Sequence, residues 1–232
     1  GIVEDTPCKN IRMPKKTHKE ANYFSLDEVK VLLKALEALP AAELKFKVAI
    51  YLGLFGGLRK GEIMGLNRED VDFDRNEITI KRTRMIKPGE GIYEDTPKTD
   101  KSIRAVTLPG EVMTEIRRLI AQQKEMKLQL HNQYHDSAAL LRSDSGDPLY
   151  PQVLQRWFTR FLQKNGLRHV GLHSLRHTHA SMLAYLGTDK MQVSTRLGHS
   201  QLSTTLNIYT HLFENVDRKI AEDLSSSFLN AR

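Results

Sequence analysis

The stretch FKVAIYLGLFGGLR, residues 46–59, decides the fold. Its first ten residues are nearly all apolar apart from Lys47, and such a run predicts a helix that is buried in the middle of the protein. The pair Gly56-Gly57 predicts where this helix ends, because glycine readily adopts the left-handed conformation that closes a helix. The rest of the chain is therefore expected to pack around a central helix over residues 46–55.

The segment before this helix carries a clear helix start. Ser25-Leu26-Asp27-Glu28 has the form of a capping box, in which Ser25 accepts from a backbone amide of the first turn and Glu28 reaches back to the amide of Ser25. Apolar residues then recur at spacings of three and four, which predicts one buried stripe and excludes a strand. A helix is expected from here to about Leu39, with Pro40 as its stop.

The segment after residue 59 predicts a small sheet and then more helices. Residues 60–66 suggest a short helix, residues 77–82 and 102–108 alternate as strands do, and glycines and prolines between 87 and 100 indicate hairpins. Helical spacing then returns in a series of segments: 110–130, 150–163, 173–186, 189–197, 203–210 and 213–228. The predicted fold class is mainly α with a small three-stranded antiparallel sheet.

Composition and charge favour an intracellular protein with a polyanionic partner. The chain of 232 residues has 35 Lys and Arg against 28 Asp and Glu, a formal net charge of +7, and this excess attracts polyanions without proving that one binds. Its single cysteine, Cys8, excludes an internal disulfide and a cysteine-based metal cluster. No apolar run approaches the ~18 residues of a membrane span. These features predict a cytoplasmic location.

Three short clusters carry the residue types of phosphate chemistry. They are residues 57–62 (GLRKGE), residues 173–177 (HSLRH) and residues 197–199 (LGH), the last followed ten residues later by Tyr209. His173 and Arg176 lie three apart at the start of a predicted helix, so they share a face, to which the helix N-terminus adds amide donors and a positive dipole. Such a face is suited to a phosphate group.

Each of these residues also has an ordinary structural interpretation. Arg59 could cap the preceding helix, His173 could be an N-cap, His199 a packed histidine in a turn and Tyr209 an aromatic at the edge of the core. The combination changes this balance, because the four boxes together, in this order, resemble the tyrosine recombinases of the phage-integrase type. The fourth box is the segment Ile208-Tyr209-Thr210-His211. The resemblance extends from about Ser25 to Tyr209 and implies the catalytic-domain fold of that family.

The resemblance implies a role for six residues in DNA cleavage. Two arginines would clamp the scissile phosphate, because their planar forks match a phosphate better than lysine does. Tyr209 would attack to form a 3′-phosphotyrosyl link, with His173 as its base. The family places a catalytic lysine on the hairpin that here holds Lys98, with Lys101 as the alternative. The predicted catalytic set is Arg59, Lys98, His173, Arg176, His199 and Tyr209.

No cofactor or metal is expected, because no cluster of carboxylates and no glycine-rich phosphate loop is visible in the sequence. Residues 1–20 read as the remnant of a linker and residues 21–232 as the catalytic domain, with the family's N-terminal core-binding domain absent from this chain. The resemblance implies double-stranded DNA as the partner and a homo-oligomer, a tetramer on DNA, assembled through the helix of residues 213–228. It also implies a location in the cytoplasm of a bacterial cell, in association with the nucleoid. The predicted function is site-specific DNA recombination by strand cleavage and religation, and the alternatives are a type IB topoisomerase-like enzyme and a DNA-binding regulator without turnover.

Overall fold

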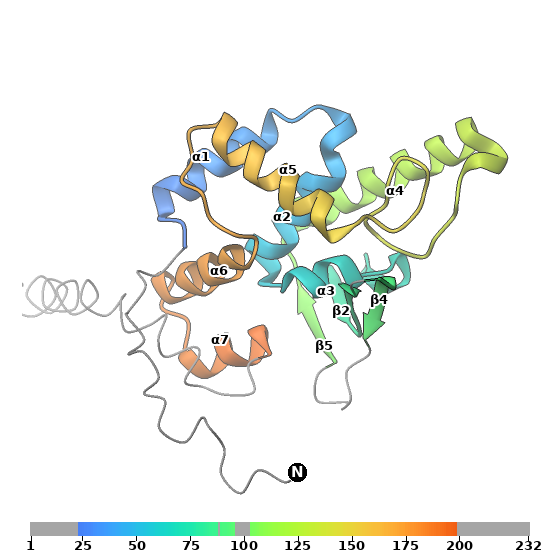
Figure 1. Cartoon of the computed structure of the whole chain (residues 1–232). Helices are drawn as coiled ribbons and strands as arrows, with labels where there is room; N and C mark the ends of the chain where they lie inside the picture. Colours follow the sequence, from blue (N-terminus) through green and yellow to red (C-terminus); the bar gives the residue numbers. More distant parts are fainter. Residues whose placement is uncertain (1–22, 88, 96–102, 199–232) are drawn as a thin grey trace, which may run out of the picture.

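The computed structural model describes residues 23–87, 89–95 and 103–198. The central helix α2, Leu44–Gly56, is buried on nearly all of its surface and packs against helices α4, α5 and α6. Figure 1 shows it in the middle of the molecule. Each fully buried aliphatic side chain of α2 contributes about 1.5–3 kcal/mol through its removal from water, so this helix anchors the core that the apolar run predicts.

The helices around α2 are those that the periodicity predicts. Helix α1, Leu26–Glu37, begins with the capping box, since the Ser25 backbone N donates to Glu28 Oε2 at 2.7 Å and the Glu28 backbone N donates to Ser25 Oγ at 3.2 Å. Helix α3 spans Lys60–Gly65, α4 Gly110–Leu130, α5 Pro151–Lys164, α6 His173–Tyr185 and α7 Lys190–Leu197. Short 3-10 turns lie at Ala41–Glu43, Arg68–Asp70 and His131–Gln133.

The predicted three-stranded antiparallel sheet is present, with the strand order β1-β2-β5. Strand β1 is Val71–Asp72, β2 is Glu77–Ile80 and β5 is Arg104–Thr107, and the register pairs Ile78 with Val106 and Ile80 with Arg104. The side chains of Ile78, Ile80 and Val106 face the core. Figure 1 shows β2 and β5 below helices α4 and α5, and Arg104 is the first residue of β5.

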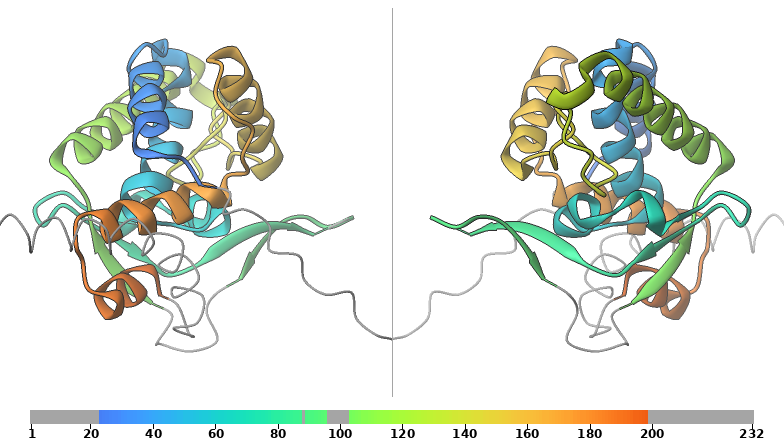
Figure 2. Two further views of the ribbon diagram at one scale, coloured as in Figure 1. Left: turned by 90° about the vertical axis from the view of Figure 1, so that its left-hand side faces the viewer. Right: turned by 90° about the vertical axis from the view of Figure 1, so that its right-hand side faces the viewer.

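A second, two-stranded sheet was not predicted as a separate unit. Strand β3, Thr83–Lys87, pairs with β4, Gly91–Asp95, and this hairpin projects from the body of the protein in both views of Figure 2. Its base is held by Arg84, whose buried guanidinium donates to Met64 O at 2.8 Å and pairs with Glu94. The expected strand over residues 77–82 ends at Ile80, because the chain turns there to begin this hairpin.

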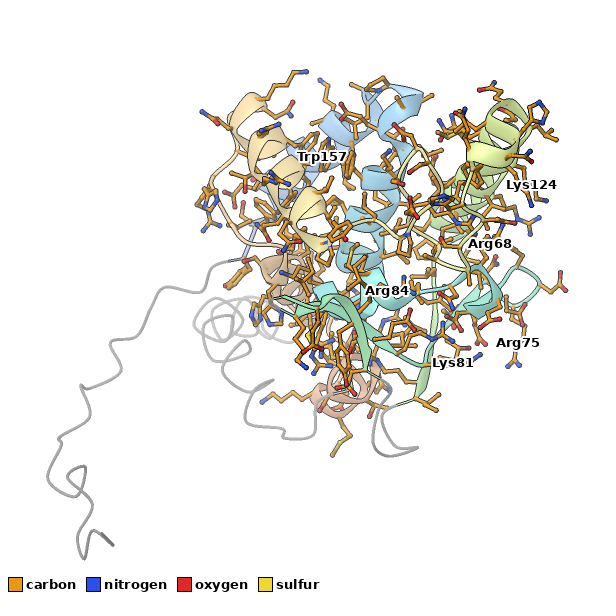
Figure 3. All side chains as sticks on the ribbon, turned by 45° about the vertical axis from the view of Figure 1, so that its right-hand side comes forward. Arg68, Arg75, Lys81, Arg84, Lys124 and Trp157 are labelled. Carbon is orange, nitrogen blue, oxygen red and sulfur yellow. The ribbon has the colours of Figure 1, made fainter. Side chains whose placement is uncertain are left out.

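The one tryptophan lies in the upper helical layer. Trp157 of α5 stacks on Phe46 and Phe161, with ring centroids 4.5 and 4.9 Å apart, and its Nε1 donates to Glu43 Oε2 at 2.8 Å. Figure 3 shows Trp157 among the helices and Arg84 below it at the hairpin. Because the chain has a single tryptophan, its fluorescence reports on the packing of the helical core.

Within the described residues, no helix is long and apolar enough to cross a membrane. The same part of the chain has no group of three or more His, Cys, Asp and Glu side chains placed to hold a metal ion.

Candidate active site

The loop between α2 and α3 places Arg59 at the start of α3. Gly57 closes α2 with a φ of 67°, and a Cβ atom at this position would lie 2.6 Å from His179 Cδ2 and 2.7 Å from Leu197 Cδ2. Both the backbone conformation and the lack of space therefore require glycine here. The next residue, Leu58, is fully buried, which fixes the chain just before Arg59, the N-cap residue of α3.

A buried carboxylate, Glu62, organises two arginines from distant parts of the chain. It accepts hydrogen bonds from the Arg59 backbone N at 2.8 Å and Arg59 Nη1 at 2.9 Å, and from Arg104 Nη1 and Nη2 at 3.0 and 2.8 Å. Burial raises the pKa of the Glu62 carboxyl, but the hydrogen bonds and charges of Arg104 and Arg59 outweigh this and hold its pKa below the usual range of a glutamate. Glu62 is therefore ionised at neutral pH.

Arg176, in the first turn of α6, is the most enclosed of the three arginines around Glu62. Its side chain is 2% exposed, with Nη1 donating to Gly57 O at 2.7 Å and Nη2 donating to Leu197 O at 2.5 Å. Nη1 also lies 3.9 Å from Glu62 Oε2. Burial and the neighbouring charge of Arg59 lower the pKa of Arg176 to about 9, which still leaves it protonated at neutral pH.

The C-terminal end of α7 is held by three different arginines. The carbonyl of Arg196 accepts from Arg104 Nε at 3.2 Å, that of Leu197 from Arg176, and that of Gly198 from Arg59 Nη2 at 3.4 Å. These carbonyls form the negative end of a helix dipole, so cations are favoured beside them. The end of α7 and the arginine cluster thus form one unit.

The cluster keeps an excess of positive charge. We define it as the guanidinium groups that surround the end of α7: Arg59, Arg104, Arg176 and Arg196. Among the residues that the structure describes, Glu62 is the carboxylate that pairs with three of these groups, Arg59, Arg104 and Arg176. Four cations around one carboxylate can stabilise a further anion, and the 40% exposure of the Arg59 side chain leaves a cation within reach of solvent.

His173 lies beside this cluster at the first position of α6. Its exposed imidazole makes an edge contact with His177, with ring centroids 4.8 Å apart. Desolvation lowers the pKa of His173, and the charges of Arg176 and Arg59 lower it further. A histidine that stays neutral at neutral pH can accept a proton, as a general base must.

The structure brings together three of the six predicted site residues, Arg59, His173 and Arg176. The other three, Lys98, His199 and Tyr209, lie outside the described residues, as does the alternative lysine Lys101. The predicted helices of residues 203–210 and 213–228 lie outside them too. The interpretation of Arg59 as a cap on the preceding helix is wrong, since Gly57 caps α2 and Arg59 begins α3.

Sequence reasoning assigned no role to Glu62, Arg104 or Arg196. Glu62 stands in the GLRKGE cluster, and its spacing of three from Arg59 is a signal for a contact within one helical turn. Arg104 and Arg196 show no comparable signal, because their partners are a carboxylate far along the chain and backbone carbonyls. His179 of α6 is buried behind the cluster, with its Nδ1 2.9 Å from Leu54 O.

The mainly helical fold with its small antiparallel sheet is that of tyrosine recombinase catalytic domains. It matches the Tn1549 transposon integrase, solved in complex with transposon right end DNA, with a TM-score of 0.74 at 24% identity over 89% of this chain and 67% of that one. It also matches the XerA recombinase, with a TM-score of 0.66 at 24% identity over 87% of this chain and 64% of that one.

The model of the phage integrase family matches residues 22–215, so the chain belongs to this family. A tyrosine recombinase XerC-like protein of Caldanaerobacter subterraneus subsp. tengcongensis is 32% identical over 99% of this chain and 62% of its own length. The ICEBs1 integrase of Bacillus subtilis is 28% identical over 96% of this chain and 59% of its own length. The chain thus spans about 60% of the length of these two relatives.

Proposed function

We propose that this chain is the catalytic domain, residues 21–232, of a site-specific DNA recombinase of the integrase type. It cuts and rejoins double-stranded DNA through a 3′-phosphotyrosyl link at Tyr209, without metal or ATP. The observation that carries the proposal is the arginine cluster: Arg59 and Arg176, from distant parts of the chain, both contact Glu62 and the carbonyls at the end of α7, beside His173 and with an excess of positive charge. Phosphodiester transfer needs such an excess, because negative charge develops on the phosphate oxygens.

Arg59 is the first of the two arginines to meet a phosphate. Its side chain is 40% exposed, whereas that of Arg176 is 2% exposed. Each terminal nitrogen of Arg176 carries a second hydrogen beyond its bond to a carbonyl, so donors remain for a phosphate oxygen once DNA binding opens access to them. Glu62 holds Arg59 in place by bonding to its backbone and its guanidinium together.

His173 takes the proton of the Tyr209 hydroxyl as this oxygen attacks the phosphorus. A free tyrosine has a pKa near ~10, so the attack needs both a neutral base and the field of nearby arginines. Lys98, or Lys101 in its place, then protonates the departing 5′-oxygen, and His199 donates to a non-bridging oxygen. The phosphotyrosyl link conserves the energy of the broken bond, so a 5′-hydroxyl from a second strand can reverse the reaction and reseal the DNA.

The relatives support double-stranded DNA as the partner. The Tn1549 integrase was solved with transposon DNA, and the XerC-like relative is named a tyrosine recombinase. A formal net charge of +7 favours contact with the phosphate backbone.

The test is a search for a covalent protein–DNA adduct. The chain is mixed with a pool of short duplexes that have a randomised core and a single-strand nick, so that cleavage near the nick releases a fragment and traps the adduct. We expect an SDS-resistant adduct that is lost in Tyr209→Phe and kept in the matched variant Tyr93→Phe, whose residue lies on the projecting hairpin. DNA binding without any adduct would instead support a regulator that does not cleave.

We also propose that the chain assembles as a tetramer on DNA through the helix of residues 213–228. Deletion of the residues after Asn215 should then weaken assembly in native gels with the captured DNA. Unchanged assembly of the shortened chain would refute this part of the proposal.

A further inference from the structure

Arg196, in the last turn of α7, ties three other elements together. Its Nη2 donates to Thr107 O at the end of β5 at 2.9 Å and to Phe55 O in the last turn of α2 at 3.2 Å. Its Nε donates to His179 Nε2 of α6 at 3.2 Å. A planar guanidinium can serve such divergent acceptors at once, whereas an ammonium group cannot do so from one fixed position.

The partners of His179 define which of its nitrogens carries the proton. Leu54 O lies 2.9 Å from Nδ1, and because a carbonyl can only accept, Nδ1 must donate. Nε2 is then the unprotonated nitrogen, which fits its role as acceptor from Arg196. Burial lowers the pKa of His179 to about 4, so the ring is neutral at neutral pH. His179 thus holds Arg196 in one orientation.

The end of α7 depends on such polar contacts, because it has little apolar packing. The buried residues of its small cluster are Ala180, Val193 and Leu197, and this cluster is separate from the main core. Arg196 lies directly before Leu197 and Gly198, whose carbonyls accept from Arg176 and Arg59. The chain then continues into His199 and, ten residues later, Tyr209.

We propose that Arg196, oriented by His179, is a positioning residue for DNA cleavage. It fixes the end of α7 against α2, α6 and β5, and so sets both the alignment of Arg59 and Arg176 and the point from which the chain leaves toward His199 and Tyr209. This inference rests on the proposed function, in which those residues act on the phosphate.

A pair of substitutions at His179 separates positioning from general stability. In His179→Gln, the side-chain amide reaches the place of Nε2 and keeps an acceptor for Arg196, but it loses the donor to Leu54 O. In His179→Asn, the amide lies at the place of Nδ1, so the donor to Leu54 O is kept and the acceptor for Arg196 is lost. Both variants lose one buried hydrogen bond, so they should lose similar stability in urea denaturation followed by Trp157 fluorescence.

The activity test uses a DNA sequence that the wild-type chain captures from the nicked pool. We expect Arg196→Lys to lower the single-turnover rate of adduct formation at saturating DNA by about 100-fold, the effect of a displacement of ~1 Å at a reacting centre. His179→Asn should also lower this rate, and His179→Gln should keep it near the wild-type value. The dissociation constant for DNA should change little in any of them. The matched control is Arg118→Lys on α4, whose side chain is 61% exposed and pairs with Glu115.

Hydrogen exchange gives a readout that does not need activity. The amides at the end of α7 should exchange faster in Arg196→Lys and His179→Asn than in His179→Gln. The proposal is overturned if Arg196→Lys cleaves at the wild-type rate, or if the two His179 variants lose activity equally. A wild-type chain that forms no adduct would instead refute the proposed function, and the exchange rates would still test whether Arg196 fixes α7.

Discussion

Replacement of Glu62 by glutamine tests whether the arginine cluster depends on one buried charge. The carboxylate is 5% exposed and accepts four hydrogen bonds, two from Arg59 and two from Arg104. Glutamine has almost the same shape, but it is neutral, and its amide NH₂ would face guanidinium donors. Glu62→Gln therefore leaves the largely enclosed Arg104 and Arg176, with side chains 14% and 2% exposed, without a counter-charge.

The expected loss is about 3–5 kcal/mol of unfolding free energy, the usual cost of breaking a buried ion pair by removing one partner. That is a large part of the ~5–15 kcal/mol that holds a typical domain folded. The sign of its pH dependence follows from the lowered pKa of Glu62 in the folded state. The contribution of ionised Glu62 to the unfolding free energy is fully present above the usual pKa range of a glutamate. It is lost as the pH falls through the lowered pKa of the folded state.

The assay is urea denaturation at several pH values, followed by Trp157 fluorescence and by circular dichroism. The difference in unfolding free energy between wild type and Glu62→Gln should be largest near neutral pH and should shrink in acid. The control is Glu125→Gln on the exposed face of α4, which should change the stability by less than about 0.5 kcal/mol. A loss of under about 1 kcal/mol for Glu62→Gln, or a loss that does not depend on pH, would refute this account of the cluster.

Two further predictions concern the residues behind the cluster. Gly57→Ala should destabilise the chain by about 2 kcal/mol or more in urea denaturation, because left-handed backbone alone costs ~1–2 kcal/mol and the new Cβ would also collide with His179 and Leu197. The control Gly89→Ala, at a φ of 81° and with no atom within 4 Å of the new Cβ, should lose only the backbone part of this free energy. Equal losses in the two variants would contradict the steric argument. The pKa of His179 falls to about 4 on folding, so acid should lower the free energy of unfolding by about 3 kcal/mol in all as the pH falls from ~6.5 toward 4, with the full stability present above pH ~6.5. His179→Gln should remove this acid sensitivity in pH-dependent thermal melts. An unchanged pH profile in this variant would refute the assignment.

The helices could be predicted from the sequence because their signals are local. The capping box of Ser25 and Glu28, the apolar run of α2 and the glycines at 57 and 198 each act within a few residues of where they stand. The same holds for the shared location of His173 and Arg176 at the start of α6. The sheet was harder, because the hairpin of β3 and β4 is held by long-range contacts of Arg84.

The organisation of the site could not be predicted, because its partners are distant or are backbone atoms. Nothing near Arg104 in the sequence indicates its pairing with Glu62, and side-chain identity says little about which carbonyls accept from Arg176 and Arg196. The burial of Arg176 and its bonds to two carbonyls have no local signal in the sequence either. The roles of Lys98, His199 and Tyr209 stay predictions from the family resemblance.

The most direct test of the central claim is to identify the amino acid and the DNA end in the covalent adduct. The adduct from the nicked pool would be digested with protease and nuclease and sequenced by mass spectrometry, and the released DNA end would be tested for labelling by polynucleotide kinase. The account predicts a nucleotide linked through its 3′-phosphate to Tyr209, a free 5′-hydroxyl on the other strand end, and the same yield in the presence of a metal chelator. A link to any other residue, a 5′-phosphotyrosyl bond or a requirement for metal would contradict it.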